Sequence, residues 1–243
     1  MSEQRILRHD EAGLATLTLN RPDKLNALDT QAFEELDAHL AKLEQQADRI
    51  GCVVLRGAGR GFCAGADLGS IAAATATFKP KVIDRLGRLP QPTIAAIHGV
   101  CFTGALELAL ACDFIVADRT ARFADTHGKW GLVGAWGMIQ RLPRRIGVSA
   151  AKTMMLTART VEAEEAKALG LVDRLVDAGG LDALLNDFTA QILANSWHTN
   201  LHTKRILRET EAMPLAQALA DEQYRYPGYA PDYADRVAAF SKK

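Results

Sequence analysis

The chain has 243 residues, and its 29 Lys and Arg balance 29 Asp and Glu, so the formal net charge at pH 7 is zero. A neutral chain has no overall field that attracts nucleic acid or an anionic membrane, so we expect neither as a partner, and any anionic ligand must be bound by local groups. This length suffices for one main domain with a sizeable core and a C-terminal extension.

The N-terminus and the apolar segments indicate where in the cell the protein is expected. The opening residues MSEQRILRHD lack the basic segment, apolar run and cleavage site of a secretory signal and are too acidic for a transit peptide, so we expect a cytoplasmic protein. The longest apolar stretch, Thr93 to Cys112, is interrupted by His98 and Glu107, which favours a buried strand and helix over a membrane span. The cysteines form no CxxC pair, so we expect reduced, mostly buried thiols.

The first predicted elements are a hairpin and a helix. Residues Ile6 to Leu19 predict two short strands around the turn HDEAG, because the second strand alternates as LATLTL. After the loop NRPDKLNALD, apolar residues recur at helical spacing from Phe33 to about Gln46. This pattern predicts an amphipathic helix with Asp29 or Thr30 as its N-cap.

The middle of the chain alternates predicted strands and helices. CVVLRG, PTIAAIHG and DFIVAD are predicted strands, and GALELALAC is a predicted helix before the last of them. From Ser149 onward the pattern is almost wholly helical, with LVDRLVD as the exception. We therefore predict an α/β fold with a core over residues 1–181 and a helical C-terminal region over residues 182–243 that packs on a neighbouring subunit.

Two glycine-containing segments are candidates for a ligand site. GRGFCAGADL, residues 59–68, follows a predicted strand and concentrates small residues, so its backbone N–H groups are accessible to a ligand. In HGVCFTGALELALACD a turn with Gly104 opens an apolar helix whose first N–H groups favour negative charge. Glu107 lies in the first turn among apolar neighbours, and burial there raises a carboxyl pKa toward the range of proton transfer. The alternative is a glutamate that only complements the helix dipole.

Four segments resemble, in order and spacing, the successive signatures of the crotonase (enoyl-CoA hydratase/isomerase) superfamily. They are NRPDKLNAL (20–28), GFCAGADL (61–68), the run 95–113 that ends GALELALACD, and ALGLVDRLV (168–176). The resemblance implies a crotonase-like spiral of ββα units that binds acyl-CoA, with the amides of Ala66 and Gly104 as an oxyanion hole for the thioester oxygen. It also implies an acyl-CoA-contacting loop and a lysine near the nucleotide end of CoA. These substrate-binding residues are Lys24, Ala64, Gly65, Ala66, Asp67, Leu68 and Gly104.

The resemblance also implies partners and cofactors. We expect a homotrimer or a dimer of trimers, with coenzyme A present only as part of the substrate. The chain has no cluster of metal ligands and no strand-linked GxGxxG, so we expect no metal, nicotinamide or flavin. Trp130 and Trp136 are candidates for lining the acyl pocket, although buried aromatics are more often core residues.

One position departs from the family pattern and decides the predicted reaction. Hydratases of this family place two glutamates around the substrate double bond; Glu107 matches the first, and His127 stands at the second. One interpretation is that His127 replaces the carboxylate as acid or base, with Asp125 orienting it. A second is that Glu107 alone moves a proton between the carbons flanking an enolate, which is all that a double-bond isomerase requires. A third is that His127 only caps or packs its loop. A non-catalytic acyl-CoA-binding protein is a further alternative. We favour a hydratase that adds water across the 2,3 double bond through a stabilised enolate, with Glu107 and His127 as its catalytic residues.

Overall fold

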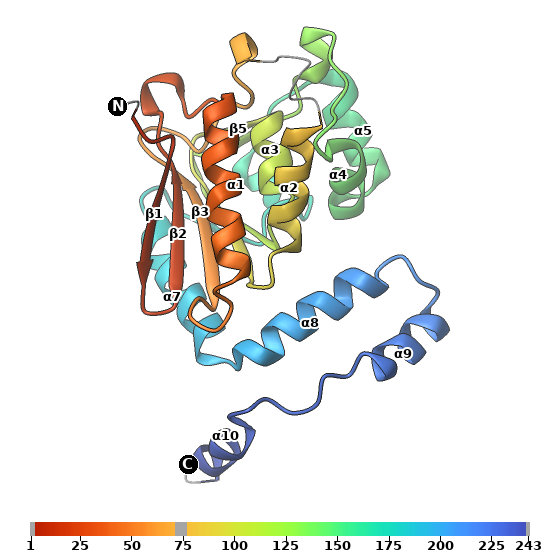
Figure 1. Cartoon of the computed structure of the whole chain (residues 1–243). Helices are drawn as coiled ribbons and strands as arrows, with labels where there is room; N and C mark the ends of the chain where they lie inside the picture. Colours follow the sequence, from red (N-terminus) through yellow and green to blue (C-terminus); the bar gives the residue numbers. More distant parts are fainter. Residues whose placement is uncertain (1–2, 71–76, 242–243) are drawn as a thin grey trace.

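A mixed sheet of six strands runs through the core of the molecule (Figure 1). The computed structural model describes residues 3–70 and 77–241. The strands lie in the order β1 (Ile6–Glu11), β2 (Leu14–Leu19), β3 (Cys52–Gly57), β4 (Thr93–Ile97), β6 (Phe114–Asp118) and β9 (Arg174–Val176). The first pair is antiparallel and every later pair is parallel. The carboxyl ends of the parallel strands therefore meet at one edge, where α/β proteins bind ligands.

The hairpin turn differs from its prediction. Strand β1 continues through Glu11, and the connection to Leu14 consists of Ala12 (φ 47°) and Gly13 (φ 84°) alone. Two consecutive residues with positive φ form the tight turn whose twist matches the flanking strands. The predicted turn HDEAG was therefore wrong in extent, because its polar residues His9 to Glu11 belong to an exposed edge strand.

A second, smaller sheet has three strands, with one parallel and one antiparallel pair. It contains β5 (Val100–Phe102), β7 (Arg122–Ala124) and β8 (Val161–Glu162), and Cys63 adds an isolated bridge to Cys101. Two passages through the core each give one strand to the large sheet and a short strand to the small sheet before a helical turn or helix follows. The units β4–β5–α3, with α3 at Gly104–Ala109, and β6–β7–η4, with η4 at His127–Trp130, are the ββα repeats of the predicted spiral.

Both faces of the large sheet are covered by helices, and neighbouring residues of β3 face opposite sides. Cys52 and Val54 pack with α7 (Leu181–Ala194), whereas Val53 and Leu55 pack with α1 (Thr30–Glu44) and α2 (Phe78–Arg88). Burial on both sides explains the continuous apolar sequence of this strand. The predicted cap of α1 is confirmed, because the Asp29 carboxylate accepts a hydrogen bond of 2.8 Å from the Ala32 N–H. All four cysteines are free and buried.

The remaining helices form the second half of the chain. They are α4 (Met138–Ile146), α5 (Val148–Thr157), α6 (Ala163–Ala168), α8 (Trp197–Thr210), α9 (Leu215–Tyr224) and α10 (Tyr233–Phe240). Helix α8 is tied to the core by Lys204, which lies 2.6 Å from the Asp113 carboxylate, but α9 and α10 stand apart from the sheets (Figure 1). Neither α9 nor α10 has a buried residue. In the part of the chain that the structure describes, no helix has the length and hydropathy needed to cross a membrane.

Candidate active site

The loop after β3 holds the Ala66 amide in a defined direction. Leu28 N–H donates to the Gly65 carbonyl at 2.8 Å, and Asp67 N–H donates to the Leu28 carbonyl at 2.9 Å, which forms a parallel bridge around Ala66. In such a bridge the flanking residues make the hydrogen bonds, so the N–H of Ala66 itself points to the opposite side. Within residues 3–70 and 77–241 this N–H has no acceptor, and it is therefore available to a ligand.

Hydrogen bonds of two buried side chains, Cys63 and Asn26, also hold this loop in place. The Cys63 sulfur accepts a hydrogen bond of 3.3 Å from Gly65 N–H and donates its own proton to the Asn26 carbonyl at 3.0 Å. The Asn26 side chain, which is 2% exposed, donates to the carbonyls of Ala58 and Gly61 at 2.8 and 2.9 Å. These contacts satisfy buried polar groups that would otherwise destabilise the fold, and they join the segments 20–28 and 58–66 into one rigid unit.

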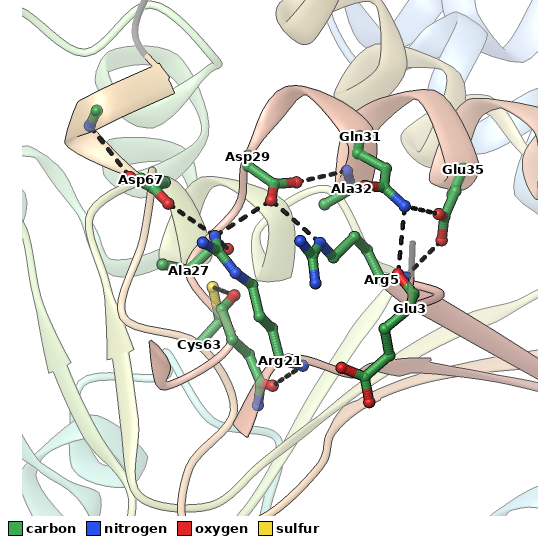
Figure 2. A network of polar contacts seen from close by, with 12 residues as sticks. Glu3, Arg5, Arg21, Ala27, Asp29, Gln31, Ala32, Glu35, Cys63 and Asp67 are labelled. Carbon is green, nitrogen blue, oxygen red and sulfur yellow. Dashed lines mark hydrogen bonds and ion pairs between the residues drawn. The ribbon is translucent and has the colours of Figure 1, made fainter. Parts of the chain in front are cut away.

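An ion-pair network anchors the end of the loop (Figure 2). The Arg21 guanidinium lies 2.7 Å from the Asp67 carboxylate and 3.2 Å from that of Asp29, the N-cap of α1. The hydrogen bond from Arg21 lowers the pKa of Asp67. Asp67 is therefore occupied with holding the loop in place. Lys24, at the end of the short helix η1 (Pro22–Lys24), is exposed and is not among the described residues that line the cavity, so its contact with CoA stays a prediction.

The second predicted amide lies beside the first. Thr103, immediately before α3, has φ 53° and ψ −111°, a conformation that is costly for a β-branched residue and is held by a hydrogen bond of 2.8 Å to the Ala124 carbonyl. A Cβ on Gly104 would lie 3.3 Å from the Ala66 nitrogen and 2.5 Å from the Trp136 ring. Only glycine fits there, and the structure thus brings the Ala66 and Gly104 amides to one place.

Glu107 is buried in α3 with its two oxygens in different surroundings. Its side chain is 1% exposed, and Oε1 accepts hydrogen bonds from the backbone N–H groups of Trp136 at 2.8 Å and Met138 at 3.0 Å. Oε2 is buried and has no hydrogen-bond partner among the described residues. Burial raises the pKa of Glu107, and the two backbone donors oppose that shift only in part. The chain therefore presents one carboxyl oxygen for proton transfer and clamps the other.

His127 faces the available oxygen of Glu107. Its Nε2 lies 3.7 Å from Oε2 of Glu107, and its Nδ1 donates a hydrogen bond of 2.6 Å to the buried Asp125 carboxylate. Burial alone lowers the pKa of His127, but the hydrogen bond and charge of Asp125, together with the charge of Glu107, outweigh it and raise the pKa above the ordinary value. The structure thus places His127 between the carboxyl groups of Asp125 and Glu107.

These groups open into a cavity of about 530 Å³. Ala64, Ala66, Leu68 and Gly104 line it together with Glu107 and His127, whereas Gly65 and Asp67 support the loop from outside it. Most of the other wall residues are apolar, as in other small-molecule sites. They include Phe102, Trp130, Leu132, Val133 and Trp136. Both tryptophans that were candidates for the acyl pocket therefore line the cavity.

Lys79 is one of several cavity residues that the sequence-based prediction did not include. Lys79, in the first turn of α2, lines the cavity although it is only 3% exposed. Its ammonium nitrogen lies 5.6 Å from the ring centroid of Phe33 and 5.9 Å from that of Trp136. In sequence Lys79 belongs to the ordinary-looking run FKPKVIDRL, where nothing distinguishes it from the exposed Lys81.

Comparison with known proteins shows similarity to the enoyl-CoA hydratase/isomerase family over most of the chain. A family model described as enoyl-CoA hydratase/isomerase matches residues 9–230. The 1,2-epoxyphenylacetyl-CoA isomerase of Escherichia coli is 34% identical over 98% of this chain and 95% of its own length. The short-chain-enoyl-CoA hydratase of Clostridium acetobutylicum is 29% identical over 100% of this chain and 97% of its own.

Solved structures show the same similarity in three dimensions. The crystal structure of an enoyl-CoA hydratase from Bacillus anthracis superposes with a TM-score of 0.93 at 32% identity, covering 98% of this chain and 96% of that one. An enoyl-CoA hydratase from Mycobacterium smegmatis superposes with a TM-score of 0.92 at 31% identity, covering 99% and 97% of the two chains.

Proposed function

This chain belongs to the enoyl-CoA hydratase/isomerase family, and we propose that it is a hydratase that adds water across the 2,3 double bond of an acyl-CoA thioester. The observation that carries the proposal is the pair formed by Glu107 Oε2 and His127 Nε2, which face each other 3.7 Å apart at the cavity. At that separation one water molecule can hydrogen-bond to both groups. Two acid–base groups on one water are what a hydration requires and an isomerisation does not.

The amides of Ala66 and Gly104 supply the electrostatic part of the proposed reaction. The thioester oxygen accepts from both N–H groups, and its negative charge grows as the enolate forms. Fixed donors cost no reorganisation when that charge develops, and in a water-poor site each contributes about 3–4 kcal/mol to the transition state. The strained Thr103 and the bridge at Leu28 are the structural means by which the two donors are held in position.

The proton steps balance around the two side chains. Ionised Glu107 accepts a proton from the water as its oxygen bonds to C3, and the π electrons of the double bond move into the enolate. Protonated His127 then delivers its Nε2 proton to C2, and the thioester carbonyl re-forms. Glu107 is left protonated and His127 neutral. A proton shift from Oε2 to Nε2, across the 3.7 Å that separates them, restores the starting pair.

Asp125 is a positioning residue in this scheme. It touches no reacting atom, but its carboxylate fixes the His127 ring through Nδ1 and accepts a further hydrogen bond of 3.1 Å from the His127 backbone N–H. With Nδ1 bound to a carboxylate, the transferable proton of His127 is on Nε2, which is the nitrogen nearest to Glu107.

An isomerase is the second candidate function. The Escherichia coli relative at 34% identity is named for isomerisation of 1,2-epoxyphenylacetyl-CoA. In such a reaction Glu107 alone moves a proton between two carbons of the enolate, and no water is consumed. A protein that binds acyl-CoA without turnover is the third candidate. The buried Oε2 of Glu107, which has no hydrogen-bond partner among the described residues, argues against it.

Hydration of crotonyl-CoA distinguishes the three candidates. We expect the absorbance of the conjugated thioester to fall with steady-state turnover, and 3-hydroxybutyryl-CoA to accumulate. An isomerase converts a 3-enoyl-CoA to the 2-enoyl isomer and leaves crotonyl-CoA unchanged. Binding of both thioesters without product is the result expected of a non-catalytic protein. Either of the last two results contradicts the hydratase proposal.

We also propose a homotrimer or a dimer of trimers in the cytoplasm. Helices α9 and α10 expose large apolar side chains, among them Leu215 at 75% and Phe240 at 82%, and soluble proteins seldom leave such faces uncovered. Light scattering is expected to give a mass of three or six chains at micromolar concentration. A monomer under those conditions contradicts the proposal. The absence of a metal, nicotinamide or flavin requirement stays a prediction.

A further inference from the structure

The backbone turn that precedes α4 supports two parts of the cavity at once. Its N–H groups at Trp136 and Met138 donate hydrogen bonds of 2.8 and 3.0 Å to Oε1 of Glu107. The Trp136 ring also packs on Gly104, because a Cβ at that glycine would lie 2.5 Å from the ring. The positions of the carboxyl group and of the second oxyanion amide therefore both depend on how firmly this turn is held.

Arg141, in the first half of α4, folds back over the turn. Its Nη1 donates a hydrogen bond of 3.1 Å to the Trp136 carbonyl. The guanidinium lies directly against Gly137, since a Cβ at that glycine would collide with Nη1. Gly137 also has φ 117°, a conformation that other residues rarely adopt. The Arg141 side chain thus ties α4 to the residue whose N–H donates to Glu107.

Arg141 also brings a positive charge to this side of Glu107. Burial lowers the pKa of Arg141, and the charges of Asp84 and Glu107 act in the opposite direction. Its Nη2 lies 3.7 Å from the half-exposed Asp84 carboxylate on α2, which is too long for a hydrogen bond. On the cavity side, the charged groups that act on Glu107 are His127 and Asp125. The hydrogen bond to the turn is therefore the closest contact of the Arg141 guanidinium.

From these contacts we propose that Arg141 is a positioning residue that holds the turn over residues 136–138 and, through it, the carboxyl group of Glu107 in the geometry for proton transfer. Arg141 is not among the described residues that line the cavity, so it acts through the turn and not on the substrate. The inference rests on the proposed role of Glu107 as proton acceptor, but not on whether the reaction is hydration or isomerisation.

Loss of Arg141 has a defined electrostatic consequence. The hydrogen bonds from Met138 and Trp136 lower the pKa of Glu107 against the larger effect of burial. If the turn loosens, those donors are weakened while the burial remains, so the pKa of Glu107 rises further above its ordinary value. Loss of the nearby positive charge acts in the same direction.

The first test is Arg141→Met, which keeps an unbranched side chain but removes its donors and its charge. We expect kcat for crotonyl-CoA to fall by about 10- to 100-fold, with binding of butyryl-CoA within a few-fold of the unaltered protein. The acidic limb of the kcat/KM profile should move to higher pH, because activity requires ionised Glu107. Arg141→Lys keeps a charge and a donor, and it is expected to fall between the two.

The matched control is Arg144→Met. Arg144 is an exposed arginine of the same helix whose guanidinium donates to Gln140 and not to the turn, and it lies outside the described cavity lining. Its replacement is expected to leave kcat and the acidic limb unchanged.

A second measurement does not require turnover. Infrared difference spectra over a pH titration follow the carbonyl band of protonated Glu107, which is identified as the band that Glu107→Gln removes. In Arg141→Met this band should persist to higher pH than in the unaltered protein. Should Arg141→Met fail to fold, Arg141→Gln, which is also uncharged, is judged by the same outcomes.

The outcomes separate this inference from the hydratase proposal. Unchanged kcat and an unchanged Glu107 titration in the variant overturn the inference. Reduced kcat without movement of the acidic limb or of the infrared band also overturns it, because that result describes a general structural defect. If the band moves as expected but the unaltered protein converts neither crotonyl-CoA nor a 3-enoyl-CoA, the positioning of Glu107 by Arg141 stands and the proposed catalytic function fails.

Discussion

Glu107→Gln is expected to lower turnover of crotonyl-CoA by about 10²- to 10⁴-fold while acyl-CoA binding stays within a few-fold of the unaltered protein. The amide has the size and shape of the carboxyl group, and its oxygen can still accept from the Trp136 and Met138 N–H groups. What is lost is a group that can take a proton from water. Single-turnover kinetics and calorimetric binding of a saturated acyl-CoA measure the two effects separately.

The matched control for this variant is Glu165→Gln. Glu165 lies in α6, is paired with Arg159 on the surface, and does not line the cavity in the described residues. Its replacement is expected to leave both turnover and binding unchanged. Undiminished turnover in Glu107→Gln would remove the proposed proton acceptor and with it the mechanism built on the Glu107–His127 pair.

His127→Ala is expected to reduce hydration by about 10²-fold or more, because the proton that must reach C2 then has no positioned donor. His127→Glu is expected to retain or raise hydration, since a carboxyl group at this position restores the pair of glutamates on which the family resemblance is based. An isomerase that depends on Glu107 alone tolerates His127→Ala with modest loss. Measuring both variants with crotonyl-CoA and with a 3-enoyl-CoA therefore decides between the two reactions.

The same pair predicts the pH dependence of kcat/KM. Glu107 works ionised, so activity is lost as pH falls through its raised pKa, at a higher pH than for an ordinary glutamate. His127 works protonated, so activity is lost as pH rises through its own raised pKa. Asp125→Asn removes the negative charge that helps to raise the His127 pKa, and it should move the alkaline limb to lower pH. A purely structural role for Asp125 would lower activity without moving that limb.

The local sequence pattern was sufficient to predict the main strands and the first long helix of the fold. The strands β3, β4 and β6 and the helix α1 were predicted because apolar periodicity and the Asp29 cap are visible within a few residues of sequence. The short strands β5 and β7 were not, since three residues carry no periodicity and owe their conformation to pairing with one another. Helix α2 was also not predicted.

The candidate site was predictable in its parts but not in its geometry. Ala66 and Gly104 follow strands of the parallel sheet and its neighbour, so their proximity follows from topology and from the family resemblance. The approach of His127 to Glu107 depends on η4 and on the backbone at Trp136 and Met138, which fold back over α3 through tertiary contacts. Lys79 was missed because its burial, not its sequence context, makes it unusual.

The clamp on Glu107 Oε1 has a consequence for the glutamine variant. Two N–H donors converge on that oxygen, so an amide at this position must direct its carbonyl oxygen to them and its NH₂ group toward His127. The two backbone donors thereby fix the orientation of the side-chain amide. His127 Nε2 then faces the NH₂ donor of the glutamine in place of a carboxylate acceptor. It can accept a hydrogen bond from that NH₂ group only when it carries no proton. Glutamine at position 107 is thus expected to favour the neutral imidazole and to disable both members of the pair with one substitution.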